Sequence, residues 1–130
     1  LELGNLDAKR DWGHAKDYVE AMWLILQQDQ PNDYVISSGK QHSVRDFIDL
    51  ACKHIGFDLE WSGSGIDEVA VLKDTERVLV KINQSHYRPI EINNLVRDPS
   101  FAKRTLNWNP KYSFEDLVKE MCDYDMGEVE

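Results

Sequence analysis

Apolar residues recur at helical spacing along the first third of the chain. From Ala15 to Leu26 they return every three or four positions, which predicts an amphipathic helix over about residues 13–28. Asp11 lies where an N-cap would be. His14, in the first turn, is expected in a solvated or capping role rather than in catalysis. Met22 and Trp23 are expected to belong to the core rather than to a ligand site.

Three further helices follow from capping signals. Residues 43–46 resemble a capping box with Asp in place of Glu, and they predict a helix that Gly56 ends. Asp98 followed by Pro99 predicts the start of a short helix that ends near Asn107. Residues 113–116 predict the start of a last helix, whose apolar line is Phe114, Leu117, Val118 and Met121.

Short apolar or alternating runs between these helices predict strands. They lie at residues 33–37, 57–61, 69–71 and 78–82, and a further extended segment runs from Arg88 to Leu95. Residues 1–9 are expected to form a short extended segment that leads into a loop. Gly63 and Gly65 predict a flexible turn rather than a phosphate loop, because no third glycine follows at the required spacing and no helix is expected to start there. The mixture of helices and strands predicts an α/β fold.

Composition excludes several classes of partner. The chain has 130 residues, of which 42% are hydrophobic and 30% charged, as expected for one soluble globular unit. Its formal net charge of −9 argues against binding to nucleic acid or to an anionic membrane surface. The longest apolar run, residues 21–26, is too short to span a membrane. Cys52 and Cys122 fall in helical patterns and suit reduced thiols, which points to the cytoplasm.

Two short segments concentrate groups that could hold an anionic ligand. The first contains Asn5, Lys9, Arg10 and Trp12, and the second contains Arg88 and Glu91. A guanidinium offers a planar fork of donors that matches phosphate oxygens, and a carboxylate suits a pair of sugar hydroxyls. Two remote arginines beside a carboxylate would form a grip for a nucleoside diphosphate. The alternative is that all of these side chains are ordinary surface charges at turns.

Three blocks of the sequence closely resemble the GDP-mannose 4,6-dehydratase family of extended short-chain dehydrogenases/reductases. The blocks are Leu3–Val19, Tyr87–Glu91 and Asp98–Pro110, and they follow the family's order. The match runs from Leu1 to about Asp123. The first block is specific to this family, whereas the Arg-Asp-aromatic and Asp-Pro-helix-Trp-Pro elements occur more widely among nucleotide-sugar epimerases and dehydratases.

The resemblance implies a two-domain enzyme. An NADP-binding Rossmann domain lies mostly N-terminal, and a smaller C-terminal domain closes over GDP-mannose. In that family NADP⁺ oxidises C4 of the mannose, water is eliminated across C5–C6, and the hydride returns to C6. The product is GDP-4-keto-6-deoxymannose, a precursor of fucose and other deoxysugars. The complete enzyme is expected to be a homodimer or a homotetramer.

This chain departs from the family pattern in one important respect. It contains no Gly-x-x-Gly-x-x-Gly, and none of its five tyrosines has Lys four positions later. It starts without Met, and its first residues lack the pattern of a secretory signal. We therefore expect the C-terminal portion of a longer dehydratase, with NADP bound by the missing N-terminal portion and no catalysis by this piece alone. A helix at 13–28 severed from its Rossmann sheet would expose apolar surface.

The resemblance also predicts a division of the chain and a set of substrate contacts. Residues 1–37 would be the last Rossmann helix and strand with a substrate-binding loop, residues 38–125 a small mixed α/β substrate-binding domain, and residues 126–130 an acidic tail. The expected substrate-binding residues are Asn5, Lys9, Arg10, Trp12, Arg88 and Glu91. By resemblance the two arginines meet the diphosphate, Glu91 accepts from the ribose hydroxyls, and Asn5 and Lys9 serve phosphate or base. Trp12 contacts substrate or only packs.

Two other functions remain open at this stage. A related nucleotide-sugar epimerase or reductase shares the arginine and Asp-Pro elements, although the block around Gly4–Gly13 favours the dehydratase. A non-catalytic module that binds nucleotides or partners is the other alternative.

Overall fold

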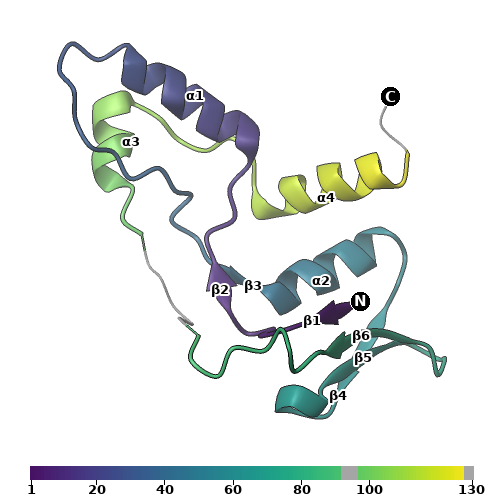
Figure 1. Cartoon of the computed structure of the whole chain (residues 1–130). Helices are drawn as coiled ribbons and strands as arrows, with labels where there is room; N and C mark the ends of the chain where they lie inside the picture. The colour runs from purple at the N-terminus through teal and green to yellow at the C-terminus, as the bar shows by residue number, and fades with distance from the viewer. Residues whose placement is uncertain (92–96, 128–130) are drawn as a thin grey trace. The chain divides into compact units, whose positions relative to one another are not determined.

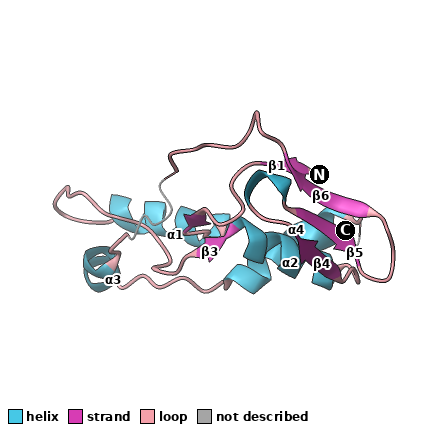
Figure 2. Ribbon diagram, turned by 90° about the horizontal axis from the view of Figure 1, so that it is seen from below, coloured by secondary structure: helices cyan, strands magenta, loops and turns pink. Residues whose placement is uncertain are grey.

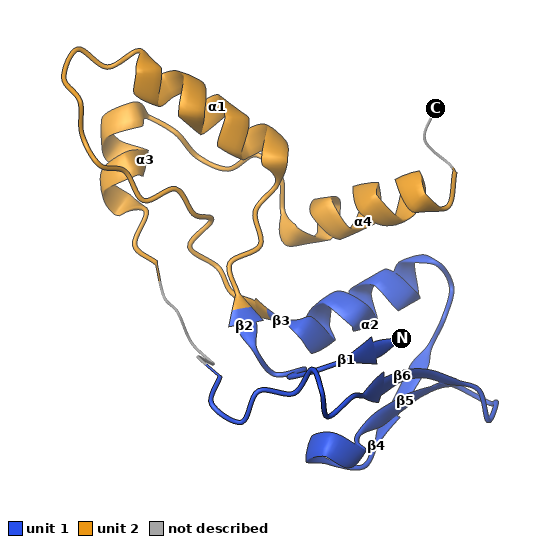
Figure 3. Cartoon of the chain, in the orientation of Figure 1, with its two compact units in different colours: residues 1–9, 43–94 blue, residues 10–42, 95–130 orange. Residues whose placement is uncertain are grey.

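The computed structural model describes residues 1–91 and 97–127, and these form two compact units (Figure 3). Unit 1 comprises Leu1–Lys9 and Ser43–Asn94, and unit 2 comprises Arg10–His42 and Leu95–Glu130. Each unit is therefore assembled from two separate stretches of sequence. The predicted division at residue 37 refers to the complete enzyme and stays a prediction.

Unit 1 is a four-stranded sheet with one helix against a face (Figure 1). Its elements are β1 (Glu2–Leu3), α2 (Val44–His54), β4 (Leu59–Ser62), the 3₁₀ turn η1 (Gly65–Asp67), β5 (Val69–Leu72) and β6 (Val78–Ile82). The strand order is β1-β6-β5-β4. β1 runs parallel to β6, with Glu2 opposite Lys81 and Leu3 opposite Ile82, and the other pairs are antiparallel.

The ends of α2 follow the signals in its sequence. The Ser43 hydroxyl accepts a hydrogen bond from the Asp46 N–H at 3.0 Å, and the Asp46 carboxylate accepts one from the Ser43 N–H at 2.8 Å. These reciprocal bonds satisfy two donors that the helix itself cannot. Gly56, just beyond the helix, has φ of 82°, a left-handed conformation that glycine adopts without strain. The predicted helix and its predicted end are confirmed.

The core of unit 1 lies between α2 and the sheet. Leu6, Ile48, Ala70 and Val80 are buried there. Leu6 comes from the segment after β1, so packing ties this segment to the helix and to the two central strands. The loop that carries Asn5 is thus held by the core at the residue that follows it.

The described residues of unit 2 form three helices, which are labelled in Figure 2. They are α1 (Ala15–Leu26), α3 (Ser100–Leu106) and α4 (Phe114–Asp125). The short strands β2 (Lys9–Arg10) and β3 (His42–Ser43) form a separate two-stranded sheet. The last two predicted helices are confirmed, and α3 ends at Asn107 in the left-handed conformation, with φ of 50°.

A buried carboxylate joins α1 to the segment before α4. Asp17 is 1% exposed, and its carboxylate accepts hydrogen bonds from the backbone N–H groups of Lys111 and Tyr112. Its carbonyl oxygen accepts from Nε1 of Trp108, which is itself 1% exposed. Trp108 packs beside Ala21 in the core of unit 2. Because each of these polar groups is paired, the carboxylate can be buried without a large penalty.

The predicted N-cap of the first helix is wrong. His14 caps α1, with Nδ1 accepting from the Lys16 N–H at 3.1 Å. Asp11 instead accepts from the N–H groups of Ser38 and Gly39. Its carboxylate therefore bonds to a turn that is distant in sequence and not to the start of the helix. For His14 the capping role is confirmed, but the side chain is 6% exposed rather than solvated.

Three local predictions are wrong: two predicted strands are not strands, and a predicted flexible turn includes a 3₁₀ turn. Residues 33–37 are not a strand; their apolar side chains Tyr34 and Ile36 pack on the core of unit 2, and no described strand pairs with them. Residues 88–91 are likewise not a strand, and the rest of that predicted extended segment, residues 92–95, lies outside the described residues. A 3₁₀ turn, η1, starts at Gly65, where only a flexible turn was expected.

One face of α1 presents large apolar side chains to solvent. Four residues at helical spacing are 60–80% exposed, namely Val19, Met22, Trp23 and Leu26. The prediction that Met22 and Trp23 lie in the core is therefore wrong for this chain. The prediction that the helix over residues 13–28 exposes apolar surface is confirmed.

Within residues 1–91 and 97–127, no helix has the length and apolar character needed to cross a bilayer. The same residues include no group of His, Cys, Asp and Glu side chains arranged to hold a metal ion. Cys52 and Cys122 are free thiols, as predicted.

Candidate functional site

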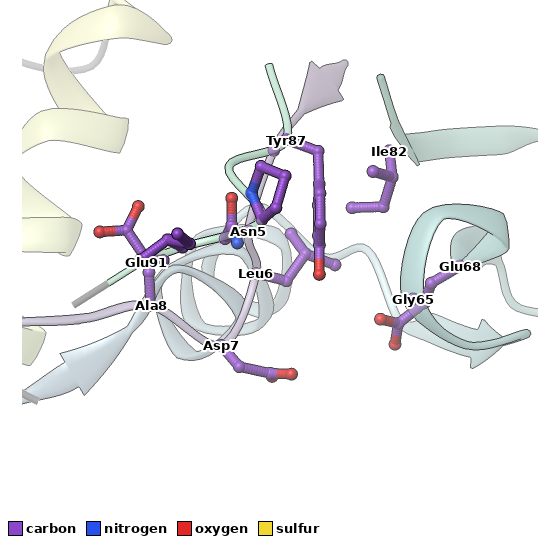
Figure 4. A pocket seen from close by; sticks show the side chains of 12 residues that line it. Asn5, Leu6, Asp7, Ala8, Gly65, Glu68, Ile82, Tyr87 and Glu91 are labelled. Atoms are coloured by element: carbon purple, nitrogen blue, oxygen red, sulfur yellow. The ribbon is translucent and has the colours of Figure 1, made fainter. Parts of the chain in front are cut away.

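A hollow of about 370 Å³ lies in unit 1 (Figure 4). One wall is the segment Gly4–Ala8, which follows β1, and another is the segment from Tyr87 to Glu91. The remaining wall comes from Gly65 in η1, Glu68 just before β5 and Ile82 at the end of β6. Figure 4 shows Glu91 and Glu68 at opposite ends of this hollow, with the Tyr87 ring between them.

Gly4 permits the close approach of two of these walls. A Cβ on this residue would overlap the backbone carbonyl oxygen of His86. Any larger residue would therefore push the first wall away from the segment that carries Arg88 and Glu91. The glycine is required here by tertiary packing, because its own backbone dihedral is not in the left-handed region.

Asn5 closes the hollow by bonding to the backbone of Arg88 in both directions. Its Nδ2 donates to the Arg88 carbonyl oxygen at 2.8 Å, and its Oδ1 accepts from the Arg88 N–H at 2.8 Å. A backbone turn that starts at Asn83 precedes this contact, and the Asn83 carbonyl oxygen accepts from the N–H groups of His86 and Tyr87. These bonds fix where the Arg88 side chain begins.

Arg88 and Glu91 differ strongly in exposure. The Arg88 side chain is 74% exposed, whereas that of Glu91 is 12% exposed and lines the hollow. Their closest charged atoms, Nη1 and Oε2, are 3.9 Å apart. This distance leaves the guanidinium fork largely available to an anion, while the carboxylate remains an acceptor inside the hollow.

The charge of the hollow suits a hydroxyl-rich or donor-rich ligand group rather than a phosphate. Asp7, Glu68 and Glu91 all line it, and Asp7 and Glu68 are paired with Arg45. Carboxylates accept from hydroxyl and amino groups and repel phosphate oxygens. A phosphate group would therefore lie outside the hollow, where Arg88 is exposed.

Lys9 and Arg10 are neighbours in β2, and Trp12 follows shortly after. Successive side chains of a strand point to opposite faces, so Lys9 and Arg10 diverge. Lys9 belongs to unit 1, and Arg10 and Trp12 belong to unit 2. Nε1 of Trp12 donates to the His42 carbonyl oxygen at 3.3 Å, and the indole meets the Phe114 ring edge-on with centroids 6.3 Å apart.

Trp12 also borders a second hollow of about 300 Å³ that lies within unit 2. The packing of Trp12 and its place at the edge of this hollow are compatible with both substrate contact and a purely structural role.

The structure brings three of the predicted site residues together, namely Asn5, Arg88 and Glu91. For Lys9, Arg10 and Trp12 substrate binding stays a prediction.

Several residues that line the hollow were not predicted as site residues. Tyr87 lay inside one of the resembling blocks, which was the available signal. Asp7 also lay inside a resembling block, but no local pattern indicates that Arg45 pairs with both Asp7 and Glu68. Hydrogen bonds from the Arg45 guanidinium to Glu68, and then to Asp7, raise the pKa of Arg45 above its ordinary value and keep it charged.

A family model described as GDP-mannose 4,6 dehydratase matches residues 1–121 of this chain. The chain belongs to the GDP-mannose 4,6-dehydratase family. The resemblance drawn from the three sequence blocks is thereby confirmed. A curated relative, GDP-mannose 4,6 dehydratase of Drosophila melanogaster, is 54% identical over 126 residues, which cover 97% of this chain and 32% of the relative. The chain thus spans about a third of the length of that relative.

Solved structures confirm the predicted fold class, part of an extended short-chain dehydrogenase/reductase. RMD from Pseudomonas aeruginosa, complexed with NADPH, gives a TM-score of 0.73 at 18% identity, covering 99% of this chain and 36% of that one. UDP-glucose 4-epimerase from Thermotoga maritima, with UDP-glucose, gives a TM-score of 0.70 at 22% identity, covering 100% of this chain and 36% of that one. At such low sequence identities the structural similarity shows the fold alone.

The described residues of this family member do not fit a dinucleotide cofactor. The pyrophosphate of such a cofactor needs a glycine-rich turn between a strand and the start of a helix. α2 follows β3 directly, with no glycine between them, and only Gly13 lies near the start of α1. A Cβ on Gly13 would overlap the Tyr18 hydroxyl, so this glycine serves internal packing.

Proposed function

We propose that this chain is the nucleotide-sugar-binding, C-terminal portion of a GDP-mannose 4,6-dehydratase, an NADP-dependent lyase. The complete enzyme would convert GDP-mannose to GDP-4-keto-6-deoxymannose with loss of water. Membership of the family supports the reaction. The observation that carries the binding role is the two-way bond between Asn5 and Arg88, which closes a hollow that Glu91 lines.

The geometry suggests how the ligand would be divided among these residues. Glu91, inside the hollow, would accept from the ribose hydroxyls, and Arg88, exposed beside it, would donate to the diphosphate. By the resemblance, Arg10 would also donate to the diphosphate. Asn5, beyond its structural bonds, and Lys9 would serve phosphate or base, and Trp12 would border the ligand.

The chemical step would need groups that this chain does not supply. NADP would be held by the remainder of the protein, because the described residues do not fit it. The chain alone would therefore bind and orient substrate without turning it over. The free thiols suit a cytoplasmic enzyme, and assembly as a homodimer or homotetramer is part of the proposal.

The mass of the product tests the proposal. The complete protein would be incubated with GDP-mannose and NADP⁺, and the nucleotide sugar would be analysed by mass spectrometry. A dehydratase gives a product lighter by one water, whereas an epimerase leaves the mass unchanged. A reductase would be detected in a parallel incubation with NADPH, by the oxidation of that cofactor. Binding of GDP without any conversion would favour a non-catalytic module.

A further inference from the structure

The wall of the hollow that carries Asn5 is attached to the first turn of α2. The Val44 N–H donates to the Ala8 carbonyl oxygen at 3.2 Å, and the Arg45 N–H donates to the Leu6 carbonyl oxygen at 3.0 Å. The first N–H groups of a helix have no partner within the helix. Here the wall supplies those partners, so the start of α2 and the wall form one structural piece.

The Arg45 side chain extends this attachment to a second wall. Its Nη1 and Nη2 donate to the two Glu68 carboxylate oxygens at 2.6 and 2.9 Å, a bidentate pair. Nη2 and Nε also donate to Asp7 Oδ1 at 3.1 and 3.4 Å. The guanidinium lies over the Trp61 ring, 4.6 Å from its centroid, and the side chain is 23% exposed. Arginine fits this arrangement because its fork is planar and rigid.

Asp7 and Glu68 line the hollow, whereas Arg45 is not among the residues that do. We propose that Arg45 is a positioning residue for nucleotide binding: it joins the two walls through Asp7 and Glu68 and so holds Asn5 in place. This inference rests on the proposed function, because it assumes that the hollow receives the nucleoside part of the substrate.

Loss of the guanidinium would change the hollow in a definite way. Asp7 and Glu68 would keep their negative charges and lose their shared cation, so the two walls would repel each other. The wall that carries Asn5 would then shift, and the nucleotide would have to reorganise it on binding. Lysine would restore one charge but could not bond to both carboxylates in the same geometry.

The test uses the complete protein with Arg45→Gln, Arg45→Lys and the matched control Arg77→Gln. Arg77 is an exposed arginine in the turn between β5 and β6 of the same unit, away from the hollow. GDP affinity would be measured by calorimetry, KM and kcat with GDP-mannose, and Tm by circular dichroism. For Arg45→Gln we expect Kd for GDP and KM to rise about tenfold at nearly unchanged kcat, the pattern for lost binding interactions. Arg45→Lys should fall between this variant and the unaltered protein, and Arg77→Gln should match the latter.

A purely structural role makes a different prediction. It would lower Tm for both Arg45 variants while leaving Kd for GDP at the unaltered value, and that result would overturn the inference. A fall in kcat at constant KM would overturn it as well. If Arg45→Gln fails to fold, the same comparison is made with Arg45→Lys. Failure of the unaltered protein to bind GDP would instead overturn the proposed function, so the two failures are distinguishable.

Discussion

Asn5 and Arg88 bond to each other across 83 positions of sequence, with the amide of one residue matched to the backbone of the other. Both hydrogen bonds measure 2.8 Å. Such a pair copies the pattern by which two neighbouring strands bond, although neither residue lies in a strand. The amide therefore fixes the place from which the Arg88 guanidinium extends.

Replacing Asn5 by Ala should weaken both folding and ligand binding. The two lost bonds predict a decrease of about 1–3 kcal/mol in the free energy of unfolding. Because Arg88 would no longer be held, Kd for GDP should rise about tenfold, on the scale of one charge-assisted contact. Urea unfolding and calorimetry on the complete protein measure the two effects.

Thr75→Ala is the matched control for this change. The Thr75 hydroxyl also bonds in both directions, donating to the Leu72 carbonyl oxygen and accepting from the Arg77 N–H, but Thr75 does not line the hollow. It should lose stability and keep GDP affinity. Equal affinity losses in both variants would show that Asn5 acts only through general stability.

Glu91 should distinguish nucleotides that have ribose hydroxyls from those that lack them. The unaltered protein is expected to bind GDP more tightly than 2′,3′-dideoxy-GDP, because the carboxylate accepts from the hydroxyls. Glu91→Ala should narrow that preference, and Glu91→Gln should narrow it less, since one acceptor oxygen remains. Calorimetry with the two nucleotides measures the ratio. If the preference for GDP over 2′,3′-dideoxy-GDP is the same in all three proteins, Glu91 does not contact the ribose hydroxyls.

Substitution of Asp17 should lower the free energy of unfolding more than substitution of any other described carboxylate of unit 2. Asp17→Ala leaves the N–H groups of Lys111 and Tyr112 without their acceptor, so the free energy of unfolding should fall by about 2–3 kcal/mol. Asp29→Ala, at an exposed position just after α1, should change it little. Urea unfolding followed by Trp fluorescence gives both values, and equal effects would contradict this account of the buried carboxylate.

The capping box of α4 predicts a pH dependence of stability. Hydrogen bonds from the Ser113 N–H and hydroxyl hold the pKa of Asp116 below its ordinary value of 3.8. A carboxyl with a lowered folded pKa stabilises the fold above the unfolded value, and this contribution is lost as pH falls through the range below 3.8. Asp116→Asn should therefore flatten the fall in stability between pH 5 and pH 2, on the scale over which such carboxyls titrate.

Asp74→Asn is the control, because Asp74 lies exposed in the turn between β5 and β6 and outside both capping boxes. Thermal unfolding across that pH range would compare the variants. An Asp116→Asn protein with the same acid sensitivity as the unaltered chain would show that the capping box does not contribute to it.

Local chemistry predicted the helices and the strands β4, β5 and β6, but not the two-residue strands β2 and β3. Ser43 and Ser113 each precede an Asp three positions on, and both capping boxes form. Failures occurred where distant residues decided the outcome. Asp11 is taken by the turn at Ser38, and Val35 has the apolar neighbours of a strand without a described strand to pair with.

The site was predictable only in part, for the same reason. The resembling blocks selected Asn5, Arg88 and Glu91, which the structure brings together. They did not reveal the role of Arg45, because its partners Asp7 and Glu68 lie 38 and 23 positions away. An ion pair between such residues is set by the fold, and no local pattern marks it.

The central proposal is that Arg88 binds the diphosphate of the nucleotide, and that Arg10, by the resemblance, binds it as well. The most direct measurement is calorimetry of GDP and of guanosine with the complete protein and its Arg10→Ala and Arg88→Ala variants. Each substitution should weaken GDP binding by about 1–3 kcal/mol, the scale of a charge-assisted contact, and leave guanosine binding unchanged. GDP binding that survives either substitution intact, or an equal loss for guanosine, would contradict the account.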